Sequence, residues 1–349
     1  MAAIRPRDLL SDELLERLGG TREVAGLIGG GSANAAATGV PAAPAVPASA
    51  DVAASLTRDI AKLVHVGYLN VALPAEFGGL GCTLRQAACG QRRLARHAPL
   101  TALAVSAHLY WTGAAADAYR GGDNSAKWIL LEAARGAVFG AGHGLPGHDL
   151  RFADPRSRCE PAGESGYRFR QPAVVSSLTP AWDWVAVHAV TATAKHNAPD
   201  AVLAFAGRGS RCTPAFRVAR VQAVGSPGDV FTTSAIGWGH AILASVEYSD
   251  ARRAFNQAVE KVERMVTAPV GGHPLDQWPV AEASLRLDAM KARIAEVTHP
   301  WPLVRGQEPD LGGQRLIGIF TMRHEVADGA RRVFSLTGQI ADAQAVAAR

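Results

Sequence analysis

Apolar residues recur at three- and four-residue spacing over three stretches in the first part of the chain, residues 51–67, 84–120 and 124–136. This period places one apolar stripe along a helix, so each stretch is predicted to be helical. The stretch 84–120 contains Pro99, and because proline interrupts a helix, we expect two helices there. A further apolar pattern over residues 7–18 predicts one amphipathic helix near the N-terminus.

The pattern changes between residues 137 and 233. Short apolar runs, several of them alternating with polar residues, are separated there by glycine, proline and aspartate. Alternation is the period of a strand with one buried face. We therefore expect a small, mostly antiparallel β region in this part of the chain.

The helical period returns from Ile236 and occupies three segments, 236–265, 279–297 and 313–336. We expect the last of them to end at Thr337 and Gly338, because glycine commonly follows the end of a helix. A helical bundle of this kind usually has four helices. With only three, an apolar face is left for a neighbouring subunit to cover.

Residues 28–50 carry no charged side chain and consist mainly of glycine, alanine, proline and serine, so they are predicted to form a linker or long surface loop. The fold class predicted is α+β, with an N-terminal helical domain, a central small antiparallel β domain and a C-terminal helical bundle. The expected boundaries are 1–50 for a first helix and linker, 51–136, 137–234 and 235–349.

The composition narrows the class of protein. Hydrophobic residues make up 48% of the chain but aromatic residues only 6%, and alanine, the best helix former, is abundant. The net charge of +5 is spread along the sequence without a run of Lys and Arg. These features favour close-packed helices and argue against binding to nucleic acid.

The four cysteines, Cys82, Cys89, Cys159 and Cys212, form no C-x-x-C pair and too sparse a set for a disulfide framework. No apolar run approaches the roughly 20 residues that span a bilayer, and the N-terminus lacks the pattern of a signal peptide. We therefore expect a cytoplasmic protein with free thiols and without a membrane span. No set of residues has the spacing of metal ligands.

Four segments together resemble the acyl-CoA dehydrogenase superfamily. GYLNVALPAEFGGLG at 67–81 is similar to the N-terminal signature of that family, and GGDNSAKWILLEAARG at 121–136 to its G-[ST]-x-x-Q-K helix. FGAGHGLPGHD at 139–149 stands where the family has T-E-P-x-x-G-S-D, and YRFRQPAVVSSLTPAWDW at 167–184 resembles its second β motif. The motifs occur in the family's order, over roughly residues 51–338.

The resemblance implies FAD as cofactor and an oxidoreductase acting on a small molecule such as an acyl thioester. It assigns Phe139, Ala141 and Gly142 to one flavin-contacting strand. It also implies a homo-oligomer, or a hetero-oligomer, in which Arg264 reaches the FAD of a neighbouring subunit. A second flavin-contacting strand would contain Val175, Ser176 and Ser177.

Departures from the family bear on the reaction. Gly142 and His143 replace the Thr and Glu of T-E-P, and Val175 replaces the Trp that shields the flavin. The family's base is a Glu, placed in a loop after the last helices or in the first C-terminal helix. At the second of these positions this sequence has Gly239, and the sequence ends where the loop of the first would begin.

His240 adjoins the position of the missing Glu. An imidazole titrates near neutrality, so His240 is a candidate acid or base, with a solvent-facing residue near the start of the helix as the alternative. Glu247 is expected to be a surface or intersubunit residue. His108, His143 and His148 are further polar candidates near the expected pocket, with a structural role as the alternative.

Three functions remain open from the sequence. The first is an acyl-CoA dehydrogenase type of reaction, in which flavin N5 takes a hydride from an acyl thioester. The second is a flavin-dependent monooxygenase or oxidase on the same fold, which needs no Glu base. The third is a non-catalytic subunit of a hetero-oligomeric flavoprotein.

Overall fold

A computed structural model describes residues 5–18, 50–143, 158–161, 167–169, 174–175, 181–195, 198–207, 220–224, 230–266, 278–299 and 309–347. Predicted features outside these ranges, including His148, Ser176, Ser177 and Cys212, lie outside the described residues. The described cysteines, Cys82, Cys89 and Cys159, are free thiols.

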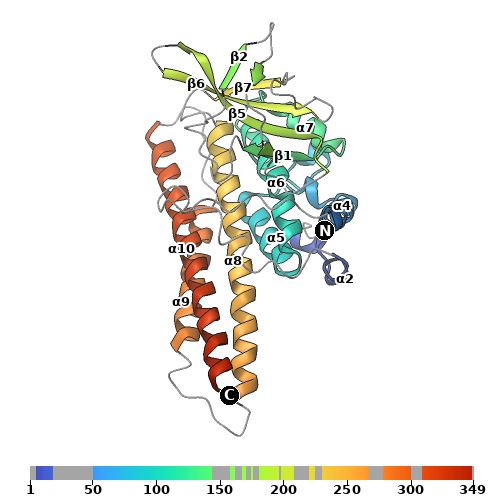
Figure 1. Ribbon diagram of the computed structural model, residues 1–349. Coiled ribbons are helices and arrows are strands. Elements are labelled where there is room, and N and C mark those ends of the chain that lie inside the picture. The colour runs from blue at the N-terminus through green and yellow to red at the C-terminus, as the bar shows by residue number, and fades with distance from the viewer. Residues whose placement is uncertain are drawn as a thin grey trace.

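The element order is helices, then strands, then helices (Figure 1). The N-terminal helices are α1 (Pro6–Leu9), α2 (Asp12–Glu16), α4 (Ala50–His65), α5 (Leu84–His97), α6 (Pro99–Arg120) and α7 (Lys127–Ala134), with short 3-10 turns η1 (Tyr68–Asn70) and η2 (Ala75–Phe77) between α4 and α5. The strands are β1 (Phe139–His143), β2 (Arg158–Pro161), β3 (Tyr167–Phe169), β4 (Val174–Val175), β5 (Trp184–Lys195), β6 (Ala198–Gly207) and β7 (Arg220–Val224). The chain continues with α8 (Val230–Val266), α9 (Trp278–Val297) and α10 (Pro309–Ala347).

Local signals explain where α5 and α6 begin. The Thr83 hydroxyl accepts a hydrogen bond from the backbone N–H of Gln86, whose side chain in turn accepts from the Thr83 N–H. This capping box satisfies two amides at the start of α5. Pro99 then occupies the first position of α6, where its fixed φ suits a helix and its missing N–H costs nothing. The predicted break at Pro99 is confirmed.

The N-terminal segment forms two short helices instead of the single one expected over residues 7–18. The Ser11 hydroxyl accepts from the Leu14 N–H and starts α2, so the chain turns between Leu10 and Leu15, both of which are buried. Arg93 of α5 donates to the Leu10 carbonyl at 2.9 Å. The segment therefore packs on the N-terminal helical domain.

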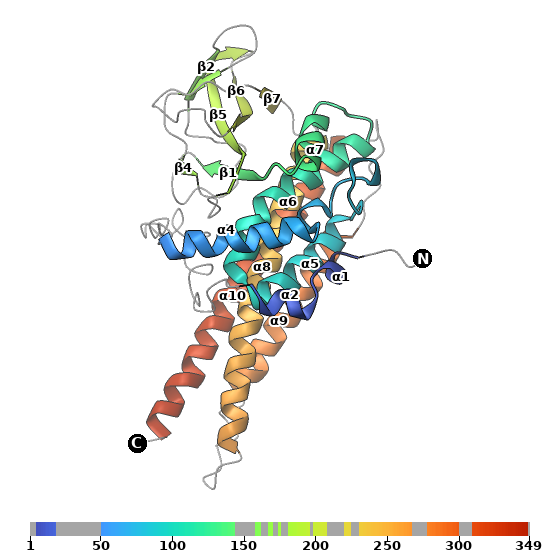
Figure 2. The ribbon, with the colours of Figure 1, turned by 90° about the vertical axis from the view of Figure 1, so that its right-hand side faces the viewer.

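The sheet is mixed and lies at one end of the long helices (Figure 1). Four of the six described strand pairings are antiparallel, as expected, but β5 runs parallel to both β1 and β2. In the view of Figure 2, β1 and β4 form the part of the sheet nearest α4.

The C-terminal bundle contains the three expected helices, with two differences at their ends. Helix α8 begins at Val230, five residues before the expected boundary at 235. Helix α10 runs through Thr337 and Gly338 to Ala347, so the predicted end there is wrong. Leu336 and Ile340 are buried on either side of Gly338, and their packing outweighs the roughly 1 kcal/mol that a helical glycine costs.

Helix α8 is the central element of the molecule. It contacts α5 and α6 on one side and α9 and α10 on the other. At the first contact, the Trp238 indole lies directly against Gly113 of α6, and a Cβ added to Gly113 would overlap atoms of that ring. Trp238 Nε1 also donates to the carboxylate of Asp117, one turn further along α6, at 2.7 Å. The two helical domains thus approach closely because residue 113 has no side chain.

We predict that Gly113→Ala lowers the free energy of unfolding by about 1–3 kcal/mol, because the new methyl group overpacks the α6–α8 contact. Denaturant titration measures this change. Gly338→Ala is the matched control, since a Cβ at that helical position meets no atom within 4 Å. It should stabilise the protein by about 0.5–1 kcal/mol. Equal stability of the Gly113→Ala variant and the wild type would contradict this account.

Candidate functional site

Strands β1 and β4 bring the two predicted flavin-contacting segments together. They pair antiparallel, with Gly142 opposite Val175 and His143 opposite Val174. The sequence placed Gly142 and Val175 in two separate motifs, and the sheet makes them neighbours. The assignment of Ala141, Gly142 and Val175 to a flavin stays a prediction, supported by this juxtaposition.

Phe139 has a different environment from the one a ring-to-ring contact with flavin would need. Its side chain is fully buried and packs against the rings of Trp128 and Phe205, with centroids 5.9 and 6.0 Å away. Any contact of Phe139 with a cofactor would therefore involve its backbone. Ala141, two residues along β1, is also buried.

The start of β1 is fixed by three side chains. The Val138 N–H donates to the Asp183 carboxylate at 2.9 Å, and the Trp111 Nε1 donates to the Gly140 carbonyl at 3.3 Å. Between them, the Phe139 N–H donates to Nδ1 of His108 at 3.2 Å. Trp111 and Asp183 were not identified from the sequence as positioning groups, although Asp183 belongs to the motif at 167–184.

His108 is buried in α6, and burial lowers its pKa to about 4, against the opposing effects of the Leu69 carbonyl and Asp183. Nε2 lies 3.0 Å from the Leu69 carbonyl oxygen. Because an amide N–H can only donate, Nδ1 must accept from Phe139, which assigns the proton to Nε2. The ring is neutral and both nitrogens are satisfied.

His240 lies well inside α8 and is only 5% exposed, so the solvent-facing alternative considered for it is wrong. Neither ring nitrogen has a hydrogen-bond partner among the described residues. The ring meets the edge of Phe320 of α10 at 5.3 Å between centroids. Burial, and secondarily the charge of Arg323, lower the pKa of His240 to about 3, so the imidazole is neutral at physiological pH.

Glu247 is not the surface residue that we expected. Its two carboxylate oxygens bond both terminal nitrogens of the Arg323 guanidinium from α10, and both side chains are buried. A carboxylate held in this way is unsuited to abstract a proton from a substrate. Glu247 is the only acidic residue of α8 between Val230 and Ser249, so this half of the helix offers no free carboxylate base.

Arg264 occupies the third-last position of α8, 24 residues after His240. At the rise of an α-helix this separation is about 36 Å along the axis. Arg264 and His240 therefore cannot serve one site within a single chain. The predicted contact of Arg264 with a neighbouring subunit's flavin is compatible with this geometry and stays a prediction.

The side chain of Trp111 on α6 connects β1 to the start of α8, whereas His240 lies further along α8. The Trp111 ring, which bonds the Gly140 carbonyl, stacks on the Phe231 ring with centroids 6.2 Å apart. His240 follows Phe231 by nine residues, which is about 14 Å along the helix axis. His240 is therefore about two and a half helical turns away from the part of α8 that Trp111 links to β1.

No three histidine, cysteine, aspartate or glutamate side chains among the described residues are grouped as metal ligands. No helix in this part of the chain has both the length and the apolar character that crossing a membrane requires.

Comparison with solved structures identifies the fold. KijD3, solved with FMN and dTDP-3-amino-2,3,6-trideoxy-4-keto-3-methyl-D-glucose, matches with a TM-score of 0.62 and 19% identity, over 81% of this chain and 76% of its own. A nitrososynthase from Micromonospora carbonacea var. africana matches with a TM-score of 0.61 and 18% identity, over 80% of this chain and 78% of its own. The dibenzothiophene monooxygenase TdsC from Paenibacillus sp. A11-2 matches with a TM-score of 0.60 and 18% identity, over 82% of this chain and 79% of its own.

No family model and no curated protein sequence matches the chain. Because the identities are below 20%, these matches establish the fold of this chain but not the reaction that it catalyses. Together with the four motifs in their expected order, they show that the chain has the fold of acyl-CoA dehydrogenase-like flavin enzymes.

Proposed function

We propose that this protein is a flavin-dependent monooxygenase, the second of the functions that the sequence left open. The observation that carries the proposal is that α8, between Val230 and Ser249, offers no free carboxylate that could act as a base. An acyl-CoA dehydrogenase needs a carboxylate beside the substrate, and this part of α8 has Gly239 in its place and only the ion-paired Glu247 nearby. The similar structures named as a monooxygenase and a nitrososynthase point the same way.

The residues present suit a flavin. The backbone of β1 and β4 around Gly142 and Val175 offers amide donors and carbonyl acceptors without bulky side chains at residue 142, which suits a planar ring with polar edges. When bound and reduced, a flavin supplies the two electrons with which dioxygen gives one oxygen atom to a substrate and one to water. FAD is the cofactor that the motifs imply, and FMN, which KijD3 contains, is the other candidate.

We assign His240 to the substrate and not to the flavin. It lies nine residues along α8 from Phe231, the residue that Trp111 links to β1, and its two buried nitrogens lack partners among the described residues. Unpaired buried polar atoms are costly unless something bonds them. A neutral imidazole offers one donor and one acceptor, so it can hold a polar group of the substrate and pass a proton to or from it.

Anaerobic titration of the flavin-loaded protein tests the reaction class. We expect FAD or FMN to bind with a change in its visible spectrum and a panel of acyl-CoA thioesters to leave the oxidised flavin unbleached. After reduction and addition of ¹⁸O₂, we expect ¹⁸O in an oxidised product of an accepted substrate. The first probes are dibenzothiophene and a dTDP-linked amino sugar.

Other results would assign another function. Bleaching by an acyl-CoA would support the dehydrogenase. A protein that binds neither flavin, alone or with excess cofactor, would instead support the non-catalytic subunit.

The buried, neutral state of His240 has a measurable consequence for stability. Its folded-state pKa of about 3 lies below the roughly 6.5 of an unfolded histidine, so the unfolded chain binds more protons between these values. The contribution of His240 to the free energy of unfolding therefore decreases as the pH falls from about 6.5 toward 3.

We predict that His240→Gln reduces the steepness of this acid destabilisation by up to about 1.4 kcal/mol per pH unit, measured by urea titrations at pH 7, 6 and 5. His65→Gln, at an exposed position of α4, is the control and should leave the slope unchanged. Identical slopes for wild type and His240→Gln would show that His240 is not buried as described.

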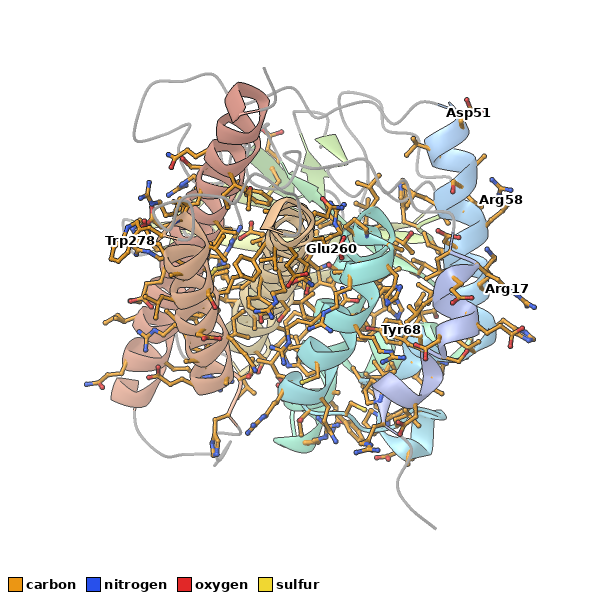
Figure 3. All side chains as sticks on the ribbon, turned by 90° about the horizontal axis from the view of Figure 1, so that it is seen from below. Arg17, Asp51, Arg58, Tyr68, Glu260 and Trp278 are labelled. Carbon is orange, nitrogen blue, oxygen red and sulfur yellow. The ribbon has the colours of Figure 1, made fainter. Side chains whose placement is uncertain are left out.

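We also propose that the protein is a homo-oligomer. Large apolar side chains are exposed on the two outer helices of the bundle: Trp278 and Leu285 on α9, and Ile317 on α10, are each about 70% exposed. Trp278 projects from the side of the molecule opposite Arg17 and Arg58 (Figure 3). Exposed apolar groups of this size commonly mark a contact with another chain.

Light scattering coupled to size exclusion tests the oligomer. We expect a dimer or larger assembly for the wild type and a smaller species for the double variant Leu285→Lys with Ile317→Lys. Leu131→Lys, at an exposed leucine of α7, is the control and should not change the mass. A wild-type protein that is monomeric at micromolar concentration would contradict the proposal.

A further inference from the structure

The Phe139 N–H, at the start of β1, donates to a side chain, and no described strand pairs with it. The Val138 carbonyl accepts from the Asp183 and Trp184 N–H groups at 2.7 and 3.1 Å, on the side of β5. Because successive residues of a strand direct their polar groups to opposite edges, the Phe139 N–H points to the other edge. At that edge, the described residues of β4 pair with Gly142 and His143.

At this edge His108 supplies the acceptor that a neighbouring strand would otherwise supply. Its Nδ1 accepts from the Phe139 N–H, and its Nε2 donates to the Leu69 carbonyl in η1. The side chain thus links β1 to the turn at 67–81 and, through its own backbone, to α6. One imidazole performs both tasks because it presents an acceptor and a donor on opposite sides of a rigid ring.

The neighbouring contacts make this link rigid. Trp111, one turn after His108 on α6, bonds the Gly140 carbonyl, so the same face of α6 holds two successive residues of β1. The aromatic rings of Trp128 and Phe205 enclose the Phe139 side chain. The backbone two to three residues later is the part expected to face the flavin.

We propose that His108 is a positioning residue, which sets β1 at the height and angle at which Ala141 and Gly142 meet the flavin. This inference rests on the proposed function, because it assumes a flavin at the β1–β4 pair. His108 itself is buried behind the strand and acts through Phe139. Loss of its acceptor should therefore loosen the strand and weaken cofactor binding, with no direct contact to the cofactor removed.

Substituting His108 with Asn or with Gln removes one of its two hydrogen bonds at a time, either the one to the Leu69 carbonyl or the one to the Phe139 N–H. In His108→Asn, the side-chain oxygen can occupy the place of Nδ1 and still accept from Phe139, whereas the bond to Leu69 is lost. In His108→Gln, the longer side chain can place its amide at the position of Nε2 and still donate to Leu69, whereas Phe139 loses its acceptor. Tyr68→Phe is the control, because it removes a buried bond to Gln91 within the same helical domain.

We expect His108→Gln to weaken flavin binding at least about tenfold, because a buried amide is left without a partner. We also expect faster hydrogen–deuterium exchange in the peptide that contains residues 138–143. His108→Asn should remain within about threefold of the wild type in flavin affinity, and so should Tyr68→Phe, even if both lose thermal stability. Fluorescence titration with FAD and FMN measures the affinities.

Equal flavin affinities for His108→Asn and His108→Gln, whether retained or weakened, would overturn the inference. Hydrogen–deuterium exchange at residues 138–143 tests whether His108 holds β1, and it can be measured without any flavin. A wild-type protein that binds no flavin would therefore contradict the proposed function but not the role of His108 in holding β1. If neither variant folds, NMR of the wild-type protein with ¹⁵N-labelled histidine shows which ring nitrogen of His108 carries the proton. A protonated Nδ1 on His108 would overturn the inference, and a protonated Nε2 would support it.

Discussion

The contact between Gly113 and Trp238 is the constraint on which the arrangement of the two helical domains depends. A glycine in the middle of a helix costs stability, and here that cost allows an indole to lie on the helix backbone and donate to Asp117. Burial raises the pKa of Asp117, while the bond from Trp238 opposes that rise. Helices α6 and α8 are held together by shape and by a polar bond at the same point.

Helix α6 also positions the sheet. Its residues His108 and Trp111 hold β1, and Gly113 and Asp117, one to two turns further on, hold α8. The relative placement of β1, where we expect the flavin contacts, and of α8, which contains His240, is therefore set by one helix. This explains why α6 is buried along most of its length although few of its residues are large.

The helices could be predicted from the sequence because their apolar period and their caps are local. The motif order also identified the fold, although the identity to similar structures is below 20%. The burial of His240 and Glu247 could not be predicted, because it depends on α10, about 80 residues away in sequence, lying over α8. The parallel β1–β5 pairing was missed for the same reason, since the two strands begin 45 residues apart and their pairing has no local signal in the sequence.

The ion pair between Glu247 and Arg323 limits how α10 can lie on α8. Two long helices with repeating apolar faces can pack almost equally well after sliding by one turn, because leucine, valine and alanine side chains substitute for one another in the contact. A buried carboxylate and guanidinium satisfy each other in only one register, and a shift would leave two charges unpaired in an apolar seam. The pair therefore disfavours other registers of α10 on α8, and in the register present Phe320 of α10 lies beside His240.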